Sequence, residues 1–200
     1  GGIVGITEET NRFYNFLWMV REQLRYLGES PPFQIFPEMV SPIYLMIPSA
    51  NKKDLQDLDL QYITLTGANL FEANISNSNL SGANLIGSEL IDAILINTIL
   101  DLAQLTRANL NGAILTNAIL RNSDLQNTDF SHALLINADL GGADLRDANF
   151  DGAELINVNL VGSKFANTKF SNTILRYAKL KSADLSHVNF SNIDLSWADL

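Results

Sequence analysis

The side chains best suited to acid–base or metal chemistry in this chain are two histidines, His132 and His187. A histidine can act as a general base or as a metal ligand when a further ligand or an orienting carboxylate lies beside it. The two histidines are fifty-five residues apart, and neither has a ligand partner in the surrounding pattern. The chain has no cysteine, so disulfides and thiolate chemistry are excluded. The sequence therefore predicts no metal site and no cofactor.

Carboxylates and hydroxyls are plentiful, but they recur at fixed places in a short repeat instead of gathering at one point. A catalytic carboxylate needs a pocket that shifts its pKa, and a repeat with a filled interior offers none. Eight of the twenty serines and threonines between Leu55 and Leu200 fall at a small, inward position of the repeat, where we expect them to pack. We therefore expect a protein that is not an enzyme and has no small-molecule substrate.

The repeat runs from Leu55 to Leu200, where every fifth residue is large and apolar: twenty-four leucines, one isoleucine and five phenylalanines. From Leu70 onward, the residue two positions before each of these central residues is usually small. Of the twenty-seven small sites from Ala68 to Ala198, only three are not Ala, Ser or Thr. This pattern predicts an interior lined by alternating small and large side chains.

A period of five fits neither a helix nor a flat strand. On an α-helix, residues five apart are rotated by about 140°, and on a strand an odd spacing sends them to opposite faces. One interior can hold all the central residues only if the chain turns after each unit, which produces a solenoid. Seventeen of the twenty-seven sites two residues after a central residue, from Gly67 to Trp197, are Gly or Asn. These residues tolerate the positive φ that a type II turn requires, so we call these sites corners.

Two patterns indicate four units in each coil. Phenylalanine recurs every twenty residues, at Phe130, Phe150, Phe170 and Phe190. The normally polar site before the central residue becomes aliphatic in steps of twenty, at Ile94, Ile114, Leu134 and Ile174. Thirty units then make about seven and a half coils, and at about 4.8 Å per coil the rod is on the order of 35 Å tall.

The unit A-[DN]-L-x-x resembles the pentapeptide-repeat proteins, as in Ala68-Asn69-Leu70, Ala108-Asn109-Leu110, Ala138-Asp139-Leu140 and Ala198-Asp199-Leu200. The resemblance covers about three quarters of the chain. It implies an all-β fold, a right-handed quadrilateral β-helix with the small and large residues inside. It implies little about function, because a shared fold does not carry a shared activity.

We expect two regions: residues 1–50, a helix plus a proline-rich segment that cap or pack on the solenoid, and residues 51–200, the solenoid itself. Apolar residues at helical spacing predict an amphipathic helix from about 8 to 27, ended by Gly28. Its apolar face would cover the open end of the solenoid, or would bind a partner or a membrane surface. Neither a membrane span nor a signal peptide is evident, so the cytoplasm is the default compartment.

The four-sided register gathers seven outward aliphatic residues on one flat face, and we hypothesise that this face binds a protein: Ile94, Ile96, Ile114, Leu134, Ile136, Ile156 and Ile174. Such a patch is large enough to mark an interface. The partner would be a second copy, giving a homodimer, or another protein; alternatively residues 29–49 fold over the face. Trp197, at an outward corner near the end of the repeat, would suit a terminal contact.

Charge narrows the choice of partner. The formal net charge is −9, which disfavours direct binding to nucleic acid because that needs a basic surface. The family resemblance implies an alternative, in which an acidic rod mimics duplex DNA and binds a type II topoisomerase. Basic residues near the C-terminal end of the repeat and the aliphatic face do not suit such a mimic. The sequence thus favours a non-enzymatic protein-interaction module that docks through a rigid solenoid face.

Overall fold

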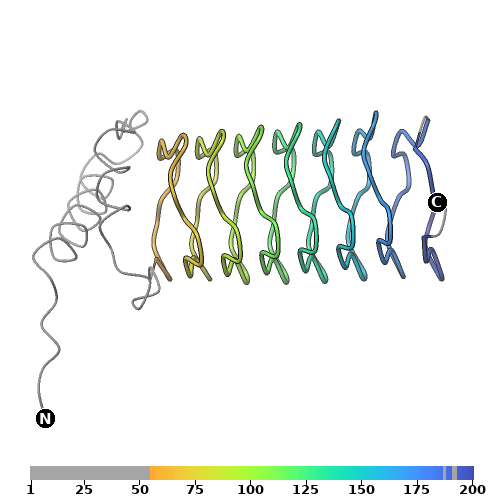
Figure 1. The fold of residues 1–200 in the computed structure, drawn as a ribbon, viewed down its shortest axis with the longest axis horizontal. Helices are drawn as coiled ribbons and strands as arrows, with labels where there is room; N and C mark the ends of the chain where they lie inside the picture. Colours follow the sequence, from red (N-terminus) through yellow and green to blue (C-terminus); the bar gives the residue numbers. More distant parts are fainter. Residues whose placement is uncertain (1–54, 187, 191–192) are drawn as a thin grey trace, which may run out of the picture.

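The computed structural model describes residues 55–186, 188–190 and 193–200. Figure 1 shows these residues as a row of similar coils stacked along the long axis of the molecule. The helix predicted near residues 8–27, the proline-rich segment and His187 lie outside the described residues. The N-terminal cap therefore stays a prediction.

Neighbouring coils are joined by single-residue contacts. The described residues contain no helix and no strand of several residues; they pair through isolated parallel β-bridges, each joining a residue to the one twenty positions later, as in Ile94↔Ile114 and Asp124↔Asp144. A step of twenty is four pentapeptides, so the prediction of a four-sided coil is confirmed. We number the faces by their central residues: face 1 through Leu95, Leu115 and Leu135, face 2 through Leu100 and Leu120, face 3 through Leu105 and Leu125, face 4 through Phe130 and Phe150.

In the middle of the stack, four of the five backbone amides of a unit have main-chain partners. In the unit around Leu115, the amide of Ile114 donates to the carbonyl of Ala93 at 2.9 Å and that of Leu115 to Leu134 at 2.7 Å. The corner amide of Asn117 donates to the next coil, and Ala118 closes the turn on the carbonyl of Leu115 at 3.0 Å. The fifth amide, on the residue after the central one, has no main-chain acceptor in this scheme.

The interior is a continuous core of buried, mostly apolar side chains. Central residues from Leu55 to Leu180 are at most 6% exposed. On face 4 the rings of Phe130 and Phe150 stack at 4.9 Å and those of Phe150 and Phe170 at 5.3 Å. Interior hydroxyls donate to main-chain carbonyls, as Thr98 does to Ile75 at 2.9 Å, and no buried side-chain nitrogen or oxygen of the described residues lacks a partner. The core is thus both packed and satisfied.

Every corner in the described ranges has a positive φ, between 52° and 70°. The prediction of a positive φ at corners, made from glycine and asparagine, is confirmed. Corners occupied by residues that rarely adopt this conformation also have a positive φ. Leu102, Tyr177 and Trp197 have φ values of 59°, 58° and 64°. The coil geometry therefore overrides local preference at these sites.

Candidate interaction face

The structure places the seven predicted aliphatic residues in two parallel columns on face 1. The column before the central residues is joined by the bridges Ile94↔Ile114, Ile114↔Leu134, Leu134↔Glu154 and Glu154↔Ile174. The column after them is aligned by corner amides that donate to the carbonyls of Thr116, Ile136 and Ile156. All seven side chains are half-buried. We call this set the aliphatic face; its role in binding stays a prediction.

The aliphatic face is broken at few points. Glu154 interrupts one column, and Thr116 and Arg176 interrupt the other. Arg176 is drawn toward the next coil by an ion pair with Asp194, with 3.6 Å between the charged atoms. Around the corner on face 2, Ile99 and Ile119 are bridged to each other and add to the apolar surface.

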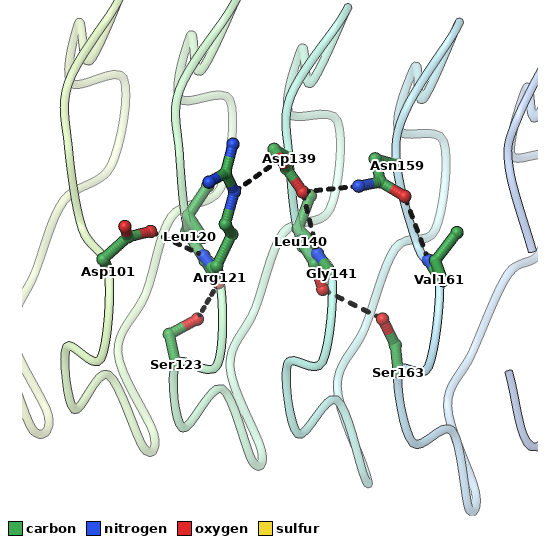
Figure 2. Close-up of polar contacts among 10 residues, drawn as sticks. All are labelled: Asp101, Leu120, Arg121, Ser123, Asp139, Leu140, Gly141, Asn159, Val161 and Ser163. Atoms are coloured by element: carbon green, nitrogen blue, oxygen red, sulfur yellow. Dashed lines mark hydrogen bonds and ion pairs between the residues drawn. The ribbon is translucent and has the colours of Figure 1, made fainter. Parts of the chain in front are cut away.

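On the other faces, an Asn or Asp before the central residue caps the fifth amide. The side-chain oxygen of Asn84 accepts from the amide of Ile86 at 3.1 Å, and that of Asp139 accepts from Gly141 at 3.0 Å. Figure 2 shows the Asp139 cap and the matching cap of Asn159 on the amide of Val161. This local bond gives a physical reason for Asn or Asp at that place in the unit.

Over most of its length, face 1 has no side chain that can cap the fifth amide. Ile94, Ile114 and Leu134 offer no acceptor, and the amides of Ile96, Thr116 and Ile136 have no hydrogen-bond partner among the residues that the structure describes. On face 2 the same loss is offset: Ile119 cannot cap the amide of Arg121, but Asp101 in the preceding coil accepts from it at 3.1 Å (Figure 2). Face 1 thus combines apolar side chains with a row of free amide donors.

An asparagine ladder borders the aliphatic face along the corner between faces 1 and 2. Each side-chain amide donates to the carboxamide oxygen one coil earlier, at 3.1, 3.1, 3.2 and 2.9 Å, in the series Asn77, Asn97, Asn117, Asn137, Asn157. Tyr177 and Trp197 occupy the next two corners of this column and are 52% and 80% exposed. The ladder holds the edge of the face in a fixed geometry.

Two acidic side chains of the columns elsewhere, Asp139 and Asp144, form ion pairs with basic neighbours. Asp144 pairs with Arg146 at 2.7 Å and with Lys164 at 3.8 Å, and Arg121 pairs with Asp139 at 2.7 Å (Figure 2). The hydrogen bond from Arg146 is the main reason that the pKa of Asp144 lies below its ordinary value, with Lys164 adding to it. The surface outside face 1 is therefore mixed in charge, not uniformly negative.

The structure brings no further chemistry to His132. It is an exposed corner residue with a φ of 58°, and its ring lies against Gly152 in the next coil. Within the described ranges, no three His, Cys, Asp or Glu side chains lie close enough together to hold a metal ion.

Sequence reasoning missed the ladder and the free amides. Both had a signal, because asparagine recurs in steps of twenty from Asn77 to Asn157, and the [DN] position turns aliphatic in three successive coils at Ile94, Ile114 and Leu134. Their significance depends on hydrogen bonds that only coordinates reveal.

Comparisons with known proteins agree with this geometry. The family profile described as pentapeptide repeats matches with eight copies, over residues 54–85, 63–101, 83–122, 98–135, 123–162 and 163–200. No curated protein matches the chain. No helix in the described part of the chain is long and apolar enough to cross a membrane.

Among solved structures, full-length QnrB1, a plasmid-mediated fluoroquinolone resistance protein, is 17% identical, covers 71% of this chain and 84% of its own, and has a TM-score of 0.50. HetL, involved in heterocyst differentiation regulation in the cyanobacterium Nostoc sp. strain PCC 7120, is 28% identical over 74% of each chain, with a TM-score of 0.30. Rfr23 from the cyanobacterium Cyanothece 51142 is 37% identical over 50% of this chain and 62% of its own, with a TM-score of 0.27.

The likeness to QnrB1 is one of fold, and it implies the right-handed quadrilateral β-helix that the repeat predicts. The family match extends from residue 54 to residue 200 and includes all the described coils. This chain belongs to the pentapeptide-repeat family.

Proposed function

We propose that this chain is a non-enzymatic protein-interaction module that docks a protein partner through the aliphatic face. One observation carries the proposal: over successive coils of face 1, the capping Asn or Asp of the repeat is replaced by Ile or Leu, and the amides of Ile96, Thr116 and Ile136 are left free.

The replacement is unfavourable for the isolated coil. A lost hydrogen bond gives up a net of about 0.5–1.5 kcal/mol, and the new side chains expose apolar surface to water. Residues that depart from the local sequence preference without stabilising the folded chain tend to be functional. Because Ile94, Ile114 and Leu134 stand in successive coils of one column, a partner that covers this column explains the three replacements together.

The scaffold suits docking. Face 1 is flat, its backbone is bonded to the coils on both sides, and the asparagine ladder fixes one edge. A preformed surface needs little ordering on association, so more of the contact energy appears as affinity.

The alternative, a DNA mimic that binds a type II topoisomerase, has less support from the surface. Its acidic columns are interrupted by Lys164 and paired by Arg146 and Arg121. The likeness to QnrB1 at 17% identity concerns fold alone. The two functions differ in salt dependence, since binding by mimicry weakens sharply as salt rises and aliphatic docking does not.

Three proteins test the proposal: the wild type, Ile114→Glu on the aliphatic face, and Gln104→Glu at the equivalent site of the opposite face 3. Solution mass by light scattering over a concentration series detects a second copy, and affinity capture from native cell lysate at low and high salt detects other partners. We expect a partner or dimer that survives high salt, persists with Gln104→Glu and is lost with Ile114→Glu. Identical masses and captured proteins for all three would contradict the proposal.

A further inference from the structure

The free amides on the aliphatic face can be reached from outside the molecule. At the same place on other faces, an outward side-chain oxygen bonds this amide, as Asn84 does to Ile86 and Asp101 does to Arg121. A partner lying on face 1 can therefore bring oxygens to the amides of Ile96, Thr116 and Ile136. These donors follow one another at the coil spacing of about 4.8 Å.

The shape of the aliphatic face limits what can occupy it. Its two columns are two residues apart along the chain, about 7 Å, and four coil steps from Ile94 to Ile174 span about 19 Å. The rectangular strip bounded by these column centres covers roughly 130 Å2, whereas a stable interface between two globular surfaces buries about 800 Å2 on each partner. A six-residue extended segment is about 20 Å long and matches the strip.

The free amide donors of face 1 further limit which kind of partner can bind there. A helix uses its main-chain carbonyls internally except in its last turn, so it cannot present a row of them along the rod. A second copy of face 1 would set donors against donors. An extended segment has free carbonyls along each side, about 6.8 Å apart, so two of them can meet the row of amides.

We infer that the aliphatic face binds one extended, apolar peptide segment that runs along the rod axis and pairs two of its main-chain carbonyls with free amides in the row formed by Ile96, Thr116 and Ile136. This inference rests on the proposed docking function and specifies the partner. The apolar side chains of the segment pack between the two aliphatic columns, and the asparagine ladder borders one side. Recognition is then partly by backbone and partly by apolar contact, as when a strand adds to a sheet edge.

A library of random heptapeptides displayed on phage, selected on the immobilised full chain, supplies the probe. We expect enrichment of peptides with several apolar residues. Synthetic copies are then titrated by fluorescence anisotropy against the wild type, Ile114→Ala, Ile114→Asn and Asn84→Ala. Ile114→Asn restores the residue that the repeat usually has, so it should keep the fold and cap the amide of Thr116.

Ile114→Ala should weaken binding about fivefold through lost apolar contact. Ile114→Asn should weaken it about a further threefold to tenfold, because it also removes the amide donor. Asn84→Ala, on the opposite face, should change nothing. Equal losses for Ala and Asn, no enrichment of apolar peptides, or equal binding by all variants would overturn the inference. If Ile114→Glu abolishes protein capture or dimerisation while no peptide binds, the docking function stands and the extended segment is wrong.

Discussion

A reciprocal exchange at two corners tests how the coil geometry stores strain. Leu102 and Asn117 both have a φ of 59°, but asparagine tolerates this region and leucine does not. Leu102 is 62% exposed, so its side chain contributes little packing. Asn117 donates to Asn97 at 3.1 Å and accepts from Asn137 at 3.2 Å. The variants Leu102→Asn and Asn117→Leu therefore change the free-energy cost of the positive φ by equal and opposite amounts. They differ in the side-chain hydrogen bonds that are gained or lost.

The magnitudes follow from these contacts. The left-handed conformation costs an ordinary residue about 1–2 kcal/mol, of which asparagine recovers roughly half. An exposed ladder bond contributes about 0.5 kcal/mol. Asn117→Leu should lower the free energy of unfolding by about 1.5–2 kcal/mol. Leu102→Asn should raise it by about 1 kcal/mol, helped by a new bond from Asn122 in the next coil.

Urea denaturation followed by far-ultraviolet circular dichroism measures both changes, and the thermal midpoint should move about 2–4 °C per kcal/mol. Because each coil contacts only its neighbours, a second probe should be used to establish that the transition is cooperative. If Asn117→Leu costs less than about 0.5 kcal/mol and Leu102→Asn gains nothing, the corners do not discriminate between side chains, and the argument from φ fails.

Two further predictions concern the core and one ion pair. Phe150→Ala should lower the free energy of unfolding by about 3–5 kcal/mol, because Phe150 is fully buried between two stacked rings and alanine would leave a cavity. Phe150→Leu should cost less, because leucine, which Leu110 already supplies in the same column, fills much of that volume. Urea midpoints compare the two variants, and equal losses would contradict the argument from cavity volume. Arg146→Gln should be less stable than the wild type at pH values above the ordinary pKa of an aspartate. This difference in stability should shrink as the pH falls through the lowered pKa of Asp144, because protonation removes the charge that Arg146 stabilises. A difference in urea midpoint that does not change between about pH 6 and pH 2.5 would refute this linkage.

Much of the fold follows from sequence because the repeat leaves the chain few options. A large residue at every fifth place needs a turn in each unit, and the phenylalanines at Phe130, Phe150 and Phe170 fix four units per coil, as the bridges confirm. The same register assigns Ile94, Ile114 and Leu134 to one column without coordinates.

Other features were beyond the pattern. The repeat shows that Asn or Asp precedes the central residue but not that its oxygen caps an amide, so the cost of placing isoleucine there was invisible. The ladder likewise depends on side-chain orientation, which composition does not determine. Corners such as Leu102 were unexpected at a positive φ, because local preference alone would not place leucine there.

The step of twenty also constrains how such a chain can change in length. An insertion or deletion of twenty residues between Leu95 and Leu135 would lengthen or shorten the rod by one coil and leave every later side chain on its former face. A change of five residues would preserve the repeat and the core, yet would rotate all later columns by a quarter turn. Genetic duplication in whole coils therefore extends the aliphatic strip, while duplication of a single unit divides it between two sides of an equally well-folded rod.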